Sequence, residues 1–293
     1  MRTKSLLYIF AVGIIFWVSC EEIVDNVDLP EAKPKLVVYS YIQPGTDTIT
    51  AQVSLSRPIT EPWSYEQPFL DDAEVSIKVD QGQEIALQFD PNTNHYFSAV
   101  GASFIEVGKK YEINVKSRDG KEVAADCVIP AQNTSLRIVK IDSVEIENRT
   151  RYRFRFEFDD PIGAPNYYRL IPKAIMKSEW EGVEYIYEYD ANFSYGEQYI
   201  AVKERDGETF ILECDIEVWT DPGWSGGERL AGVKTYLLST DEHYYHYHHS
   251  LENYEPDNPF SEPTIIYTNM NNGLGVFAGY NPFVLEYWMD GPR

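Results

Sequence analysis

The sequence predicts a mainly all-β protein. Between residues 35 and 130, apolar side chains alternate with polar ones, and Gly, Pro, Asp and Asn turns interrupt the alternation. About seven short strands within about 95 residues, with no helical periodicity, are typical of an immunoglobulin-like β-sandwich. A larger β-rich domain follows over residues 131–293, and a capping signal with 3.6-residue tyrosine spacing adds one α-helix to it.

The first domain has its apolar residues on one face of each expected strand. The strands are centred on residues 36–38, 49–55, 73–79, 85–89, 96–97, 111–115 and 123–127. Asp119-Gly120 is a hairpin turn signal between the last two of them. The domain ends at Pro130, after which a short linker leads to the second domain.

The second domain opens on a strand with one apolar and one charged face. Phenylalanines at 154, 156 and 158 alternate with Arg151, Arg153 and Arg155. The arginines could bind an anion, but we expect a solvated face balanced by acids on the neighbouring strand. Further strands are expected at 167–171, 183–189, 210–219 and 233–238.

The helix and a hairpin complete the predicted fold. Ser239-x-x-Glu242 matches a capping box, so the helix should run over residues 240–254 until Pro256 stops it. One stripe of this helix should dock on the second sheet; it comprises Tyr244, Tyr247, Leu251 and Tyr254. Residues 264–269 and 274–279, with Asn271-Asn272-Gly273 between them, predict a C-terminal hairpin.

The N-terminus predicts a lipoprotein signal peptide over residues 1–19. Two basic residues precede an apolar run from Leu6 to Val18, which is short for a membrane span and ends at Ser19-Cys20. Cleavage before Cys20 and its acylation, for example with palmitate, would anchor the chain to outer-membrane lipid. The alternatives are an ordinary secretory leader with an incidental cysteine, or an uncleaved anchor.

An acidic, flexible tether should follow over residues 20–34. Its first residues after the cysteine, Glu21 and Glu22, resemble the surface-export signal of Bacteroidota-type lipoproteins. We therefore expect the protein on the outer membrane, facing the cell surface, although a tether without a sorting role gives the same pattern.

The charge excludes one class of partner. The chain has 25 basic and 47 acidic residues; without the two basic residues of the leader the formal charge is 23 − 47, or −24. Nucleic acid binding requires clustered Lys and Arg, so we expect none. Once Cys20 is acylated, Cys127 and Cys214 remain, and buried free thiols are expected in preference to a disulfide between them.

A histidine cluster is the sharpest local motif. Four of the five histidines lie between His243 and His249, and a helix would place Glu242, His246 and His249 at i, i+4 and i+7. Such a set could bind a divalent metal, which is the only cofactor the sequence suggests. A partly exposed aromatic helix is the simpler interpretation. Candidate contacts for a glycan or peptide ligand, or for a partner, are Trp224, Tyr244 and Phe260.

Catalytic motifs are missing from the sequence. There is no G-x-S-x-G elbow, phosphate-cradling loop or dinucleotide fingerprint, and adjacent acids carry little information in so acidic a chain. We therefore expect a non-enzymatic protein, with a hydrolase as the least supported alternative.

Several segments together resemble one lipoprotein family. They are Cys20 with its acids, Pro34-Lys35-Leu36-Val37-Val38, Asp72-Ala73-x-Val75, the tyrosine-bearing helix after Leu238-Ser239, Asn258-Pro259-Phe260-Ser261-Glu262-Pro263 and Asn272-Gly273-Leu274-Gly275-Val276-Phe277. The set is similar to domain of unknown function 4249 (DUF4249). The resemblance implies an accessory or substrate-capture partner of a TonB-dependent β-barrel receptor that takes up a nutrient, with no catalytic residues to transfer. Glycan binding through exposed aromatics, or metal capture through His243–His249, are the alternatives.

Overall fold

The computed structural model describes residues 33–57, 69–80, 82–163, 165–202, 205–219, 228–254 and 265–291. The chain divides into two units, Met1–Lys33 with Pro58–Trp63, and Pro34–Arg57 with Ser64–Arg293. All elements below belong to the second unit. The predicted leader, Cys20, Trp224 and Phe260 lie outside the described residues.

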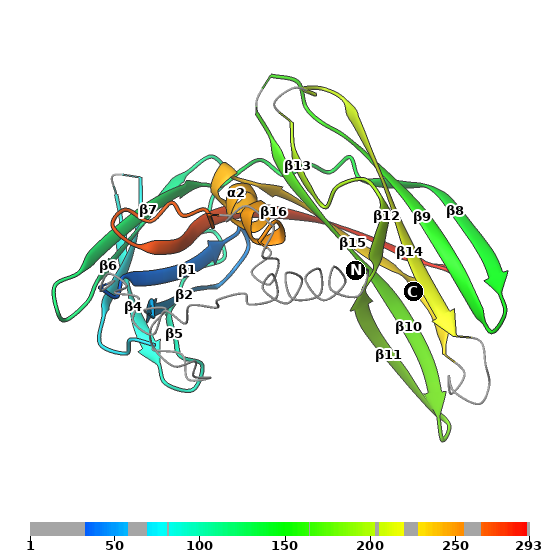
Figure 1. The fold of residues 1–293 in the computed structure, drawn as a ribbon, viewed down its shortest axis with the longest axis horizontal. Coiled ribbons are helices and arrows are strands. Elements are labelled where there is room, and N and C mark those ends of the chain that lie inside the picture. Colours follow the sequence, from blue (N-terminus) through cyan, green and yellow to red (C-terminus); the bar gives the residue numbers. More distant parts are fainter. Residues whose placement is uncertain are drawn as a thin grey trace, which may run out of the picture. The chain divides into compact units, whose positions relative to one another are not determined.

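The fold is all-β with one described helix, as the sequence predicts (Figure 1). The seven strands expected before residue 130 are all present. They are β1 (Leu36–Ile42), β2 (Thr48–Leu55), β3 (Glu74–Val79), β4 (Glu84–Asp90), β5 (His95–Ala99), β6 (Lys110–Lys116) and β7 (Glu122–Val128). Their alternating residues form one core, which contains Val38, Ile77 and Ile113 and excludes water from them.

The remaining strands are longer. They are β8 (Arg137–Ile146), β9 (Arg149–Asp159), β10 (Tyr167–Trp180), β11 (Val183–Asp190), β12 (Asn192–Tyr195), β13 (Tyr199–Ala201), β14 (Thr209–Trp219), β15 (Arg229–Thr240) and β16 (Leu274–Trp288). Among the described residues, one sheet has the order β11-β10-β15-β16-β1-β2-β5-β4-β3-β6-β7, with β13 beside β10, and the other has the order β12-β14-β9-β8.

The charged face of β9 is confirmed as a solvated, ion-paired surface. Phe154, Phe156 and Phe158 are fully buried in the second core. On the opposite face Arg153 binds Asp215 of β14 through Nε–Oδ1 at 2.7 Å, and Arg155 binds Glu213 at 2.7 Å. These arginines are therefore occupied by cross-strand carboxylates. Cys127 and Cys214 are buried free thiols, also as expected.

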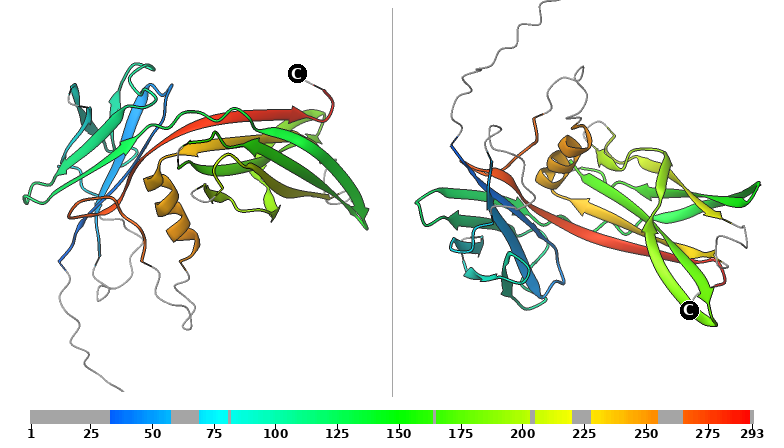
Figure 2. Two further views of the ribbon diagram at one scale, coloured as in Figure 1. Left: turned by 90° about the horizontal axis from the view of Figure 1, so that it is seen from above. Right: turned by 60° about the horizontal axis from the view of Figure 1, so that its bottom comes forward.

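Strand β16 overturns the predicted C-terminal hairpin. Its first half pairs in parallel with β1, from Val37↔Leu274 to Ile42↔Gly279, and its second half pairs antiparallel with β15 (Figure 2). Residues 265–270 form no strand. Asn269 replaces strand pairing there, because its side chain donates to Phe277 O at 2.8 Å and accepts from Phe277 N at 3.1 Å. The domain boundary at residue 130 stays a prediction, but β16 places residues 274–279 beside β1 in the interior of the larger sheet.

The helix α2 (Glu242–Glu252) is present, but the predicted cap is wrong. Asp241 is the N-cap, and its Oδ1 accepts from Tyr244 N at 2.8 Å. Ser239 is instead a buried residue of β15 that accepts a hydrogen bond from Asn133 N at 2.9 Å. Only Tyr244 and Tyr247 of the predicted stripe are buried, whereas Leu251 in the last turn and Tyr254 beyond the end of the helix are exposed. No helix in the described ranges has the length and apolarity needed to cross a membrane.

Candidate functional site

Asp241 fixes the helix to the sheet. Besides capping α2, its Oδ2 accepts from Gly279 N on β16 at 3.0 Å. Desolvation raises the pKa of Asp241 to about 7, although the backbone hydrogen bonds oppose this shift. The helix therefore has a defined position against strand β16, and the side chains on its inner face meet those of the sheet.

A cluster of rings forms where α2 meets the sheet. Tyr244 contacts Tyr41 of β1 and Tyr280 of β16, each with ring centroids 5.7 Å apart, and His248 lies 4.3 Å from Tyr244. Arg169 of β10 donates to Tyr244 Oη at 2.8 Å and lies over the ring of Tyr199. Ring contacts of this kind prefer tilted or edge-on geometry and keep the ring walls in place.

These rings border a pocket of about 510 Å³. Four adjacent strands each supply two side chains to it, because residues two apart in a strand share one face. The lining comprises Tyr41 and Gln43 at the end of β1, Ile171 and Lys173 of β10, Tyr236 and Leu238 of β15, Tyr280 and Pro282 of β16, and Tyr244 and His248 of α2. The two helix residues are one turn apart and form the wall above the sheet.

The lining is apolar with a few hydrogen-bonding groups. Burial, followed by repulsion from Arg169, lowers the pKa of His248 to about 4, so its imidazole is neutral at pH 7. Burial raises the pKa of both Tyr41 and Tyr280, which keeps their hydroxyls protonated. Lys173 is the cationic residue of the lining, and it binds Asp190 at 2.8 Å. The pocket suits an uncharged ligand with one apolar face.

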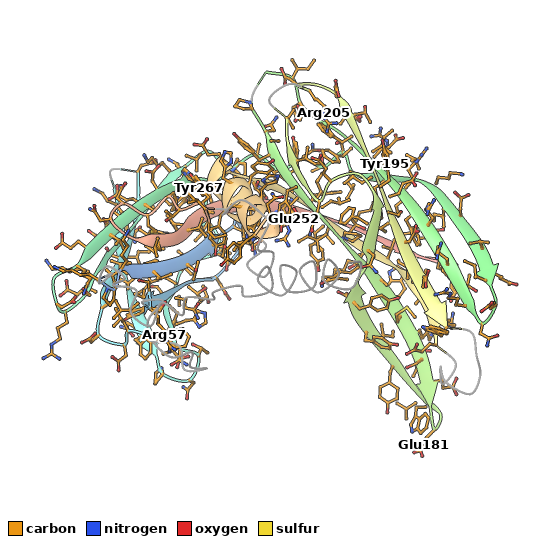
Figure 3. The ribbon with its side chains drawn as sticks, viewed as in Figure 1. Arg57, Glu181, Tyr195, Arg205, Glu252 and Tyr267 are labelled. Carbon is orange, nitrogen blue, oxygen red and sulfur yellow. The ribbon has the colours of Figure 1, made fainter. Side chains whose placement is uncertain are left out.

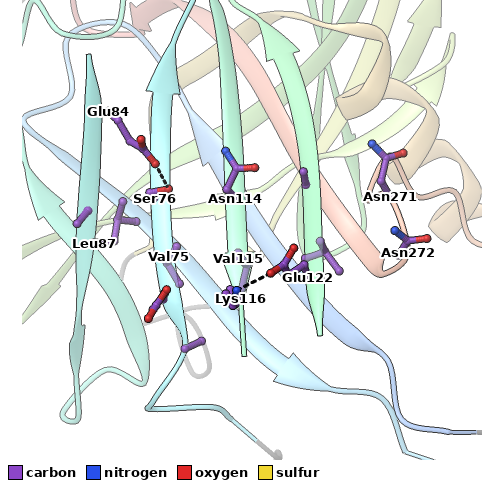
Figure 4. A pocket seen from close by; sticks show the side chains of 15 residues that line it. Val75, Ser76, Glu84, Leu87, Asn114, Val115, Lys116, Glu122, Asn271 and Asn272 are labelled. Carbon is purple, nitrogen blue, oxygen red and sulfur yellow. Dashed lines mark hydrogen bonds and ion pairs between the residues drawn. The ribbon is translucent and has the colours of Figure 1, made fainter. Parts of the chain in front are cut away.

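A larger hollow of about 820 Å³ lies over β3, β4, β6 and β7 (Figure 4). Its polar side chains satisfy one another: Ser76 donates to Glu84 at 2.7 Å, and Lys116 binds Glu122 at 2.6 Å. Its described lining contains no aromatic side chain and no buried polar residue. The 510 Å³ pocket lined by Tyr41, Tyr236, Tyr244 and Tyr280, here called the tyrosine pocket, is therefore the stronger candidate site.

Comparison with known proteins identifies the family. The sequence profile described as "Domain of unknown function (DUF4249)" matches residues 24–284, which is most of the chain. The chain belongs to the DUF4249 family. No curated protein matches.

Two bacterial alpha-2-macroglobulins are among the solved structures that resemble it. The Salmonella protein, a mutant form, is 8% identical with a TM-score of 0.25, covering 88% of this chain and 15% of the other. The trypsin-activated Escherichia coli protein is 8% identical with a TM-score of 0.24, covering 73% and 15%. This DUF4249 chain thus spans about 15% of the length of either.

The structure does not assemble the predicted metal set. Among the described residues, no group of three or more His, Cys, Asp or Glu side chains is placed to hold a metal ion. His246 contacts the rings of Tyr167 and Tyr267, and His249 stacks on Tyr245 at 5.3 Å. Glu242 is exposed in the first turn. These imidazoles are held by tyrosine rings, so helical spacing alone does not bring the three side chains to one point.

Of the predicted contact residues, Tyr244 lies in the pocket of this DUF4249 protein, as a buried wall. His248, which is not part of the predicted metal set, also lines the pocket. No sequence pattern indicates Tyr41, Tyr236 or Tyr280. They lie on three different strands, and only the order of those strands in the sheet brings them together.

Proposed function

We propose that this DUF4249 protein is a non-enzymatic, surface-exposed lipoprotein that captures a ligand for an outer-membrane β-barrel transporter of the TonB-dependent class. The tyrosine pocket carries the proposal, because an open, mostly apolar hollow with a few hydrogen-bonding groups is the usual form of a small-molecule site. The leader, the acidic residues after Cys20 and the family support the location and the transporter partner.

Anchoring and partnership are tested together in the native membrane. The lipoprotein, solubilised in mild detergent, should incorporate labelled palmitate and should co-purify with a β-barrel receptor. Cys20→Ala is the matched control, because it removes the acylated thiol and leaves the folded body unchanged. Absence of palmitate label on the wild-type chain, or recovery of the wild-type chain without any barrel protein, would contradict the proposal.

Glycan binding is the second candidate function, and the chemistry of the tyrosine pocket favours it. A sugar ring has an apolar C–H face that packs on tyrosine, and hydroxyls that bond to phenol, amide and ammonium groups. Tyr41 and Tyr280 supply ring faces, whereas Gln43 and Lys173 supply donors at the rim. The neutral state of His248 fits an uncharged ligand of this kind.

The glycan hypothesis is tested with pocket variants. We expect Tyr280→Ala to weaken binding of an oligosaccharide selected on a glycan array by about fivefold, since one aromatic stacking contact contributes roughly 1 kcal/mol. Tyr280→Phe keeps the ring and should retain most of the affinity. Tyr195→Ala, on β12, is the control at an exposed tyrosine outside the pocket (Figure 3). An equal loss of affinity in Tyr195→Ala and Tyr280→Ala would reject this site.

A further inference from the structure

Strand β11 forms an exposed edge of the larger sheet. It pairs with β10 over eight consecutive residue pairs without a register shift, and all eight of its residues are exposed. A tight turn at Glu181-Gly182, both with positive φ, joins the two strands, and Figure 3 shows Glu181 at the tip of this hairpin. In the described part of the chain no strand lies on its other side. Alternate residues of such a strand direct backbone N–H and C=O groups outward.

Strands β7, β8 and β12, at the other ends of the two sheets, carry protective features that β11 lacks. Strand β8 has a register shift between Ile138 and Lys140, and β12 has one between Phe193 and Tyr195. Strand β7 forms a bridge through Ala124 to Asn271. Lysines, bulges and covering segments are the usual means of preventing strand addition. The sequence of β11 contains no lysine or proline, and its pairing with β10 has no bulge.

The two faces of β11 differ in chemistry. Val183, Tyr185, Tyr187 and Tyr189 lie on one face, and Glu184, Ile186, Glu188 and Asp190 lie on the other. The acids form ion pairs with lysines of the same sheet: Asp190 with Lys173, Glu184 with Lys177, and Glu188 with Lys234. An added strand would therefore continue an aromatic face and a stripe of alternating charge.

We propose that β11 docks an extended segment of a partner protein as an additional β-strand, and that this segment alternates apolar residues with Lys or Arg. Main-chain hydrogen bonds to a free edge supply affinity, and alternate side chains supply selectivity. Basic side chains opposite the acidic stripe would extend the row of lysine–carboxylate pairs, and apolar ones would cover Tyr185 and Tyr187.

A second copy of this chain fits the edge poorly. Two antiparallel copies of β11 related by a two-fold axis place Glu184 opposite Glu188 when the register is centred on Ile186. When it is centred on Tyr187, Glu184 lies opposite Asp190. Like charges directly opposite each other destabilise a strand pair. The net charge of −22 adds repulsion between copies, so charge complementarity selects a basic segment from another protein.

The test uses the mature full chain and a fluorescein-labelled peptide that alternates valine or tyrosine with lysine. We expect the peptide to bind, to protect β11 amides from hydrogen exchange, and to lose about tenfold in affinity for Glu184→Lys/Glu188→Lys. A matched peptide with glutamate in place of lysine should prefer that variant. Asp142→Lys/Glu145→Lys, on edge strand β8, makes the same charge change elsewhere and should leave binding unchanged.

Three results would overturn the proposal. The first is no binding of the basic peptide to the folded wild-type chain. The second is equal affinity for the β11 and β8 variants, which would indicate attraction by net charge alone. The third is a dimer, seen by sedimentation, that the β11 substitutions abolish, since the occupant of the edge would then be a second copy. Circular dichroism of each variant establishes that β11 charge reversal leaves the sheets folded. The pocket is not involved, so this outcome is independent of the proposed function.

Discussion

Gly275 is where the parallel pairing of β1 and β16 can be tested directly. Its φ is +102°, and a Cβ at this position would lie 2.1 Å from Val38 O and 2.8 Å from Val38 C. Both atoms belong to the backbone of β1, which is itself paired with β2. Neither strand can move aside without breaking a ladder of hydrogen bonds. A side chain at 275 therefore meets strain and a clash together.

We expect Gly275→Ala to lower the free energy of unfolding by about 3 to 5 kcal/mol. A non-glycine residue at positive φ costs roughly 1–2 kcal/mol, and the rest comes from separating β16 from β1. Gly45→Ala is the matched control, because Gly45 has φ +79° but no neighbouring atom within 4 Å of the place that an alanine Cβ would occupy. It should show the strain alone, about 1 kcal/mol.

Urea unfolding followed by tryptophan and tyrosine fluorescence measures both variants. With a slope of about 2–3 kcal/mol per molar urea, the midpoint for Gly275→Ala should fall by about 1.5 M, and that for Gly45→Ala by less than about 0.5 M. Equal losses in the two variants would refute the close approach of β16 to β1, and with it the topology that places residues 274–279 beside the first strand.

Two further predictions concern the second core and the helix cap. Phe156→Ala should cost about 3–5 kcal/mol in urea unfolding because the ring is fully buried, whereas Tyr195→Ala at an exposed ring should stay within about 0.5 kcal/mol. Because the pKa of Asp241 is raised to about 7 in the folded chain, its protonated carboxyl contributes to the free energy of unfolding at pH 4, and this contribution is lost as pH rises through 7. The pKa of His248 is lowered to about 4, so the neutral imidazole contributes to the free energy of unfolding above pH 6.5, and this contribution is lost as pH falls towards 4. Asp241→Asn removes the contribution that grows on acidification and keeps the one that His248 loses. The urea midpoint of this variant should therefore fall more steeply from pH 7 to pH 4 than that of wild type, and an unchanged pH dependence would contradict this prediction.

The sequence predicts those parts of the fold that depend on local pattern. The seven strands before residue 130, the alternation of β9 and the helix near 242–252 all follow from side-chain periodicity, and all are present. The cap is a partial exception. Ser239 and Asp241 are both good N-cap residues, and the choice between them depends on Gly279, which reaches Asp241 from a distant strand.

Pairings between distant strands could not be predicted. The turn at Asn271-Asn272-Gly273 is real, since Asn272 has φ 61°, and a turn between two apolar runs normally indicates a hairpin. Here the strand after the turn pairs with β1, close to the start of the folded chain. No local pattern distinguishes these outcomes, because β16 presents the same alternation to either partner.

This unpredicted pairing is also what creates the candidate site. Strand β16 joins β1 in its first half and β15 in its second, so it brings Tyr41 of β1 beside strands that carry Tyr236 and Tyr280. The same strand holds α2 through the bond between Gly279 and Asp241. The floor of the pocket and its helical wall therefore depend on one strand. A weakened β1–β16 junction should disturb the pocket before it disturbs the phenylalanine core of β9, because that core contains no residue of β1 or of the β16 half that pairs with it. Ligand affinity is thus expected to fall in variants of this junction.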